Sequence, residues 1–312
     1  PTSGLAFNAC LSSVTGVVNY FFDYQILNTA DSDIQVAGSA AACPAPENTA
    51  QLCSDSIDND GNGFGDCMDN NCIVNVGTCR ATTTIAAIDQ AADANPAMPT
   101  LPAGAPVGVI IGNGGNADVY VTAVGPKDIW VATNKAAGPD GGLDVYMGGA
   151  TIPSGVVVGA KVNVIGSLKA YNNDTQGESL PELEGLQVNV SAAPSGQAPS
   201  GAAIASVATL NCASTGGSMC SPDTGRPYVG SLVTLTSVQV TTANDPANHN
   251  IGKLTQTVGC TGTDCAFEVE ADTMMVGKQG CTYTTITGIW TYDVYNNVYA
   301  LEPTAMTPGT GC

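Results

Sequence analysis

The sequence has little charge and very few basic residues. Charged side chains make up 11% of the 312 residues, and 8 Lys and Arg stand against 27 Asp and Glu, which gives a formal net charge of −19. Tight binding of nucleic acid depends on Lys and Arg that neutralise phosphates. We therefore expect no nucleic-acid partner, and a divalent cation is the more natural ligand for this surface.

Histidine is almost absent, because His249 is the only one and it lies in a predicted loop. A Ser-His-Asp or Cys-His site would have to use His249, but no nucleophile motif surrounds it, and zinc sites usually include a His. The paired carboxylates of a glycosidase have a possible counterpart in Glu178, Glu182 and Glu184. No general acid is placed opposite them, however, and a solvated turn is the simpler interpretation. We predict that the protein is not an enzyme.

Long apolar runs are missing as well. Nowhere do about eighteen consecutive apolar residues occur, which is the length that a membrane-spanning helix needs. The chain opens at Pro1 rather than Met, and it has no basic segment followed by an apolar run. We therefore expect a processed, soluble chain without a membrane span.

Cysteine, by contrast, is plentiful. The sequence has 12 cysteines, with no Cys-x-x-Cys-His haem motif and no zinc-type spacing. Such an even set predicts disulfides formed in an oxidising compartment, and thus a secreted, extracellular protein. Pairing within each of two groups is possible without crossing the middle segment that has no cysteine. The groups are Cys10, Cys43, Cys53, Cys67, Cys72 and Cys79, and then Cys212, Cys220, Cys260, Cys265, Cys281 and Cys312.

Two stretches of the chain alternate apolar and polar residues with period two, the pattern of half-buried β-strands. Turns rich in Gly, Pro and Asn separate the strands, which indicates small antiparallel barrels. A short helix is predicted ahead of each set, at residues 83–94 and 202–210. The predicted strands are residues 118–124, 128–133, 143–147, 161–168 and 186–190, and then residues 231–240, 253–258, 266–270, 282–292 and 297–301.

Self-comparison indicates a third, incomplete copy of this plan at the start of the chain. SSVTGVVNY at residues 12–20 aligns without gaps on TTITGIWTY at residues 284–292. The chain thus holds two complete five-strand units and only the last two strands of another. The cysteines mirror the alignment, and we predict two disulfides from it, Cys10 with Cys43 and Cys281 with Cys312.

The strands at the start of the chain lack partners. A two-strand hairpin is marginally stable in water and exposes pairing edges, so residues 1–43 need strands from another segment or another molecule. One hypothesis is that they complete a barrel in a neighbouring subunit, which would join subunits head to tail into a homopolymer. The other hypothesis, of equal weight, is that they pack on the barrels of their own chain.

These features divide the chain into five regions with an all-β fold. They are an N-terminal strand pair at residues 1–43, a Cys-rich calcium-loop region at 44–82, a first barrel at 83–190, a linker with a short helix at 191–211, and a second barrel at 212–312.

The barrels resemble the bacterial extracellular OB-fold family. Later strands of that family carry a Val-x-Val-x-Gly-x-Leu pattern followed by Tyr-Asn, as in VNVIGSLKAYN at residues 162–172. The resemblance covers residues 105–190 and 228–308, and it implies OB-like barrels that serve as ligand-binding or spacer units of secreted proteins. The sequence departs from the members that bind nucleic acid, because it lacks a basic groove with interleaved aromatic residues.

The segment CSDSIDNDGNGFGDCMDNNC at residues 53–72 resembles the Cys-flanked, Asp-rich repeats of secreted myxobacterial proteins and is similar to thrombospondin type-3 and EF-hand-like calcium loops. Ca²⁺ takes six to eight oxygen ligands, and alternate residues of a tight loop turn their oxygens inward, with Gly63 at the sixth position allowing the turn. The predicted Ca²⁺ ligands, at loop positions one, three, five, seven, nine and twelve, are Asp58, Asp60, Asn62, the carbonyl of Phe64, Asp66 and Asp69.

The loop departs from a calcium sensor in three ways. Asp69 stands where a bidentate Glu is usual, no flanking pair of helices is visible, and Cys67 and Cys72 lie inside or beside the loop. We therefore expect a rigid structural site. Two other Asp- and Gly-rich stretches, residues 112–118 and 138–144, are assigned to hairpin turns.

We predict a structural protein, a subunit of an extracellular fibre or surface assembly held by Ca²⁺, disulfides and strand pairing between molecules. The alternative is an extracellular binding module, an adhesin or the accessory of a secreted enzyme. An oligonucleotide would need a basic face, and a polysaccharide would need exposed aromatic platforms. The basic candidates are Lys127, Lys135, Lys161 and Lys169, and the aromatic candidates are Trp130, Tyr146 and Trp290.

Overall fold

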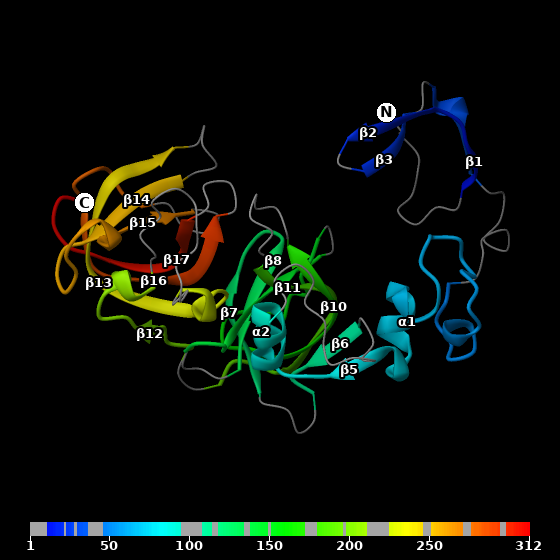
Figure 1. Cartoon of the computed structure of the whole chain (residues 1–312), viewed down its shortest axis with the longest axis horizontal. Helices are drawn as coiled ribbons and strands as arrows, with labels where there is room; N and C mark the ends of the chain where they lie inside the picture. The colour runs from blue at the N-terminus through cyan, green and yellow to red at the C-terminus, as the bar shows by residue number, and fades with distance from the viewer. Residues whose placement is uncertain are drawn as a thin grey trace.

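Strands dominate the computed structural model of the protein, and they close into two barrels of five strands each (Figure 1). This confirms the prediction of a mainly β protein with two small barrels. None of the helices in the described part of the chain has the length and apolar character needed to cross a membrane. The structure describes residues 11–21, 23–27, 30–36, 46–94, 108–113, 118–133, 138–148, 151–171, 180–195, 198–210, 225–245, 251–270, 276–293 and 298–312.

The first barrel is built from β7 (Val119–Val124), β8 (Asp128–Ala132), β9 (Gly142–Tyr146), β10 (Lys161–Tyr171) and β11 (Leu180–Ala192). In addition, β6 (Gly108–Ile111) pairs with β10. The ring runs β7–β8–β9–β11–β10 and back to β7, and only β9 and β11 pair in parallel. Alternate side chains such as Val121, Ile129, Val131 and Val145 are fully buried in one core. Period-two alternation therefore predicted the ring correctly, but not β6.

The second barrel is built from β13 (Leu232–Asp245), β14 (Ile251–Gln256), β15 (Ala266–Val269), β16 (Thr282–Asp293) and β17 (Val298–Pro308). Its ring runs β13–β14–β15–β17–β16 and back to β13, again with one parallel pair, β15 with β17. Its core is aromatic, with the ring centroid of Trp290 5.7 Å from that of Tyr299 and 6.4 Å from that of Phe267. All five predicted strands are present.

The two barrels repeat one plan down to a local irregularity. Strands β10 and β16 each carry a glycine where the register with the next strand shifts, Gly166 and Gly288. A Cβ added at either glycine would lie 2.3 Å from a carbonyl oxygen of the paired strand, that of Glu184 or Glu302. Only glycine permits this close approach, and the same solution occurs in both barrels.

Each barrel is preceded by a short strand, β5 (Arg80–Thr82) or β12 (Ala202–Ala203), that pairs in parallel with its first strand. The predicted helix at residues 83–94 is present as α2 (Ile85–Ala94), and it buries Ile85 and Ile88 in the first core. The predicted helix at residues 202–210 is wrong, because only one 3-10 turn, η6 (Val207–Thr209), follows β12.

The Gln256 side chain explains the missing helix. Its Oε1 atom accepts a hydrogen bond from the Val207 amide at 2.7 Å, and its Nε2 atom donates to the Ala205 carbonyl at 3.1 Å. These backbone groups are satisfied by β14, so the segment needs no helical hydrogen bonds. Val207 and Leu210 still reach the barrel core.

The turn at residues 138–144 joins the two barrels. The Asp140 amide donates to the Pro227 carbonyl at 2.6 Å, and the Ser231 hydroxyl donates to the Gly138 carbonyl at 2.9 Å. Gly142 lies so close to the second barrel that a Cβ there would be 2.3 Å from the Gly230 carbonyl oxygen. An apolar cluster from both barrels, formed by Ala123, Trp130, Leu232 and Ile289, is buried beside this contact.

The N-terminal segment forms β1 (Leu11–Val14), β2 (Val17–Phe21), β3 (Asp23–Leu27) and β4 (Ile34–Val36). β1 pairs with β4 and β2 with β3, both antiparallel, in two separate two-stranded sheets. Figure 1 shows these strands apart from both barrels. The predicted N-terminal strand pair is thus present as two shorter pairs rather than one.

Replacing Gly142 by Ala should destabilise the paired barrels, because the facing backbone of Gly230 would have to move. We expect chemical unfolding to show a loss of about 1–3 kcal/mol. Gly138→Ala is the matched control in the same turn, where nothing lies within 4 Å of the added methyl, and it should change the unfolding free energy by no more than about 0.5 kcal/mol. Equal stabilities would contradict the close approach.

Candidate functional site

The predicted calcium loop lies in a small disulfide-framed unit ahead of the first barrel. The Cys53–Cys72 and Cys67–Cys79 disulfides bracket it, with Cα–Cα distances of 5.7 and 4.8 Å. The internal apolar cluster of this unit consists of the cysteines and Val76, so disulfide bonds replace a larger core. Its elements are short: η3 (Leu52–Ser54), η4 (Asp66–Met68), α1 (Asn70–Asn75) and η5 (Gly77–Cys79).

Asp58, at position one, organises the first half of the loop. Its Oδ1 atom accepts hydrogen bonds from the amides of Gly61 and Asn62 at 2.7 and 3.2 Å, and its Oδ2 atom accepts one from the Gly63 amide at 2.9 Å. Gly61 and Gly63 have φ values of 73° and 94°, which favour glycine. The sharp turn that the spacing predicts at position six is therefore present.

Asp69, at position twelve, closes the loop and begins the helix. Its side chain is fully buried, and Oδ1 accepts hydrogen bonds from the amides of Asn71 and Cys72 at 2.5 and 3.3 Å, which caps α1. Its Oδ2 atom accepts a hydrogen bond from Nδ2 of Asn62 at position five. The side chains of positions five and twelve thus meet across the loop.

Carboxylates gather around Asp60, at position three. Partial burial raises the pKa of Asp60, and the negative charges of Asp69, Asp58 and Glu47 raise this pKa further. The hydrogen bond from the Asn62 amide, at 3.2 Å, acts in the opposite direction. Like charges this close repel one another, and a bound cation would relieve that repulsion.

Asp66, at position nine, turns to a different partner. Both of its carboxylate oxygens accept a hydrogen bond from the Ser56 amide at 3.1 Å. The Phe64 side chain, at position seven, is exposed, and its amide donates to Oδ1 of Asn62 at 2.8 Å. Asp58, Asp60 and Asp69 are thus each hydrogen-bonded to a group of Asn62, whereas the Asp66 carboxylate is engaged elsewhere.

Glu47, which sequence reasoning missed, holds the two halves of the loop together. Its side chain is fully buried, its Oε1 atom accepts a hydrogen bond from the Asn59 amide at 2.5 Å, and its Oε2 atom accepts one from the Asp66 amide at 2.8 Å. These amides belong to positions two and nine. Glu47 stands between Pro and Asn in an unpatterned stretch, so nothing in the sequence indicates that the fold buries it.

The loop offers donors that suit Ca²⁺, but its side chains are not gathered into a metal cage. Within the described part of the chain, no group of three or more His, Cys, Asp or Glu side chains converges closely enough to hold a metal ion. The carboxylates of Asp58 and Asp69 instead accept hydrogen bonds from backbone amides. Carboxylate and amide oxygens are the hard donors that Ca²⁺ takes, so the loop fits the ion by chemistry, and calcium binding stays a prediction.

The unit is fixed to the outside of the first barrel. Ile73 of α1 packs against Ile110 and Ile165 in a buried cluster. Nη1 of Arg80 donates to the carbonyl oxygens of Ile73 and Val74 at 2.8 and 2.6 Å, and it satisfies the end of the helix. The loop is thereby attached to the barrel through both apolar and polar contacts.

The described disulfides all join cysteines of the same group. The predicted Cys281–Cys312 pair is confirmed, and Cys260 pairs with Cys265 across a short loop. The predicted pair of Cys10 with Cys43 lies outside the described residues, as do Cys212 and Cys220.

The aromatic platforms proposed for polysaccharide binding are wrong for both tryptophans. Trp130 is 7% exposed in the contact between the barrels, and Trp290 is fully buried in the second core. Tyr146 is half-buried. Because the outward-facing strand position of Trp130 is covered by the second barrel, its ring face is closed to a sugar.

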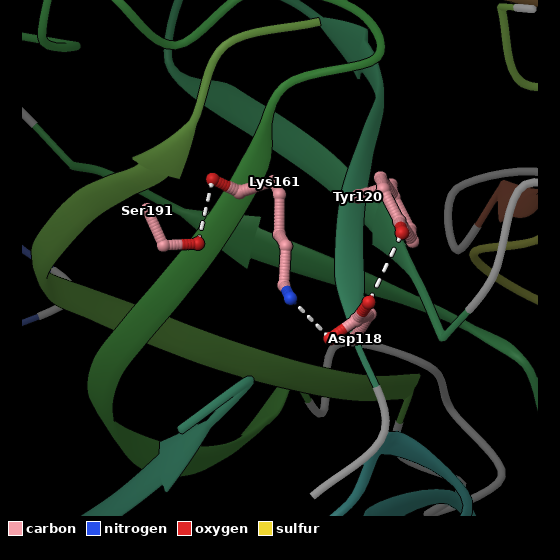
Figure 2. Close-up of polar contacts among 4 residues, drawn as sticks. All are labelled: Asp118, Tyr120, Lys161 and Ser191. Carbon is pink, nitrogen blue, oxygen red and sulfur yellow. Dashed lines mark hydrogen bonds and ion pairs between the residues drawn. The ribbon is translucent and has the colours of Figure 1, made fainter. Parts of the chain in front are cut away.

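The structure also weakens the case for a basic face that could bind an oligonucleotide. Lys161 forms an ion pair with Asp118, whose carboxylate accepts a hydrogen bond from the Tyr120 hydroxyl at 3.1 Å (Figure 2). The hydrogen bond from Lys161 lowers the pKa of Asp118. Lys127 is exposed. The side chains of Lys135 and Lys169 lie outside the described residues.

Glu182 and Glu184 lie in strand β11 rather than in a solvated turn, which corrects the interpretation from sequence. Glu182 pairs in register with Asp144 of β9. Burial raises the pKa of Asp144 well above its usual range, and the charges of Asp128 and Glu182 raise this pKa further. The outer surface of the barrel thus concentrates acid here. Glu178 and His249 lie outside the described residues.

No family model, no curated protein and no solved structure matches this chain. The resemblance to extracellular OB-fold proteins and to calcium loops therefore stays a prediction from the sequence.

Replacing Glu47 by Gln should loosen the loop, because the new amide group would face a backbone amide and one of the two buried amides would lose its acceptor. We expect hydrogen exchange at the Asn59 and Asp66 amides to become at least about tenfold faster, the equivalent of about 1.4 kcal/mol. The Ile73 amide, bonded to the Asp69 carbonyl in α1, is the internal control and should change little. Unchanged exchange at Asn59 and Asp66 would show that Glu47 does not hold the loop.

Proposed function

We propose that this protein is a structural subunit of an extracellular assembly, such as a fibre or a surface layer, held by disulfides, Ca²⁺ and strand pairing between molecules. The N-terminal strands carry this proposal. They lie apart from the barrels (Figure 1) and present large apolar side chains to solvent. These side chains are Leu11, Val14, Val17, Val18, Ile26 and Leu27.

Such a strand set favours a partner. Val18 is 65% and Ile26 is 52% exposed, and a two-strand hairpin is only marginally stable in water. Covering a Val or Ile side chain fully is worth about 1.5–3 kcal/mol. Among the described strands, none adds to either two-stranded sheet, so these apolar strands gain most from pairing with strands of a neighbouring molecule. A second copy joined head to tail is the simplest form of such an assembly.

The disulfide-framed loop would make the connection to the first barrel rigid. Asp58, Asp60, Asn62 and Asp69, with the carbonyl of Phe64, would hold Ca²⁺, and the ion would supply positive charge where carboxylates repel one another. Four described disulfides support an oxidising, extracellular compartment.

The alternative function, a binding module for polysaccharide or oligonucleotide, has lost its main support. Both tryptophans are buried, and Lys161, one of the basic candidates, is paired with Asp118. We therefore favour the structural role.

Asp60→Asn should have opposite effects with and without calcium. In chelator it should raise the thermal midpoint, because it removes a charge that Asp58, Asp69 and Glu47 repel. With calcium it should weaken binding at least about tenfold by titration calorimetry, because a ligand charge is lost. Asp66→Asn is the matched control, and it should affect affinity less, since that carboxylate bonds to Ser56. No calcium binding by the unaltered protein would contradict the predicted site.

The double variant Val18→Asp, Ile26→Asp should abolish self-association. Buried charge in an intermolecular sheet is costly, so light scattering should change from large species to monomer. Val258→Asp is the matched control, because Val258 is 63% exposed in the second barrel but lies outside the N-terminal strands. A uniform monomer of the unaltered protein in calcium would contradict the assembly.

A further inference from the structure

The N-terminal strands reproduce the pairing of the closing hairpin of the second barrel, β16 with β17. β1 and β2 match β16 at one constant offset in residue number, whereas the match of β3 and β4 to β17 shifts by three residues between Leu27 and Ile34. In both places two tyrosines face each other near the tip, and a pair of core-type residues comes next. The matching register pairs are Tyr20–Tyr24 with Tyr292–Tyr299, Val18–Ile26 with Trp290–Leu301, Val17–Leu27 with Ile289–Glu302, Val14–Ile34 with Ile286–Met306, and Leu11–Val36 with Tyr283–Pro308.

The copy extends to the irregularities of the sheet. The register shifts after Leu11 in the N-terminal pair and after Tyr283 in the second barrel. A Cβ at Gly16 would lie 2.5 Å from the Leu27 carbonyl oxygen, which is the same close approach that Gly288 makes. A sheet that repeats these defects as well as the pairing has the geometry of a barrel hairpin rather than of an isolated ribbon.

In the second barrel, known neighbours cover this hairpin. β13 runs antiparallel along β16, and β15 runs parallel to β17. Together with β14 they bury Trp290 and Leu301 completely. The counterparts Val18 and Ile26 are 65% and 52% exposed, so within the described residues no strands cover the corresponding face of the N-terminal hairpin.

We propose that residues 11–36 are the closing hairpin of a third barrel, completed by a three-stranded β-meander of the β13–β15 type from another stretch of polypeptide. The proposal rests on the assembly role proposed above and names the partner of its strands. One partner strand runs antiparallel along β1 and β2, and another runs parallel to β3.

The chemistry of the partner follows from the size of the side chains. The hairpin offers Val18 where the second barrel has Trp290, and Ile26 where it has Leu301. A core of native density then requires larger side chains on the other half. The meander therefore carries alternating apolar residues with an aromatic one facing Val18.

The barrels of a folded second copy do not supply this meander. In the closed ring, β13, β14 and β15 are each already paired with two neighbours. Pro303 and Pro308 also remove amide donors from β17, which makes it a poor edge for addition. The partner strands therefore come from polypeptide other than the described strands of this barrel.

The test joins a second copy of residues 225–280, the half barrel that covers β16 and β17, to the N-terminal side of Leu11 in the full chain. Hydrogen exchange of the β2 and β3 amides should become at least tenfold slower than in the unaltered chain diluted to monomer. Val18→Trp, which restores the counterpart of Trp290, should slow it further in the fusion only. A control fusion carries Leu235→Asp in the added copy, because Leu235 is fully buried in the second core, and it should give no protection.

Unchanged exchange in the fusion, or equal protection in the control fusion, would overturn the third barrel. Light scattering separates this result from the assembly itself. A monomeric unaltered chain would refute the proposed assembly whatever the fusion shows, whereas a multimeric chain with an unprotected fusion would refute only the proposed partner.

Discussion

A small barrel is stable only when every strand has a neighbour on both sides, and this closure governs the rest of the molecule. Both complete barrels satisfy it through the same step, a parallel pairing that joins β9 to β11 and β15 to β17. Closure removes free edges and gathers the inward side chains into one core for each barrel. In the part of the chain that the structure describes, the N-terminal hairpin has matching residue pairs but no strand that closes it, and its apolar face lies in solvent.

The sequence was informative where a side chain's role depends on its own strand. Alternation predicted the barrel strands because inward positions such as Ile129 and Val131 need only be apolar. It failed where a distant group decides. The segment at 202–210 has a helical composition, but Gln256, 49 residues after Val207, satisfies its backbone. Trp130 was predicted to be an exposed platform, and this was wrong because no single strand reveals that a second barrel covers it.

The same contrast holds at the loop between the hairpin and the first barrel. Spacing predicted the turn at Gly63, because that turn is a consequence of local geometry. It could not predict that Asp66 turns to Ser56, or that Glu47 is buried beneath the loop, because both depend on how the disulfides fold the segment back on itself. This unit is held by disulfides and carboxylate hydrogen bonds rather than by a large apolar core, and a bound Ca²⁺ would stabilise it further.

Hydrogen exchange of the protein isolated in its native state tests the central claim most directly, namely that residues 11–36 pair with strands of another molecule. The account predicts that the amides of β2 and β3 are protected to the same order as those of β16 and β17, and that dilution to monomer removes this protection while the barrels keep theirs. Fast exchange of β2 and β3 in the native material, at every concentration, would contradict it.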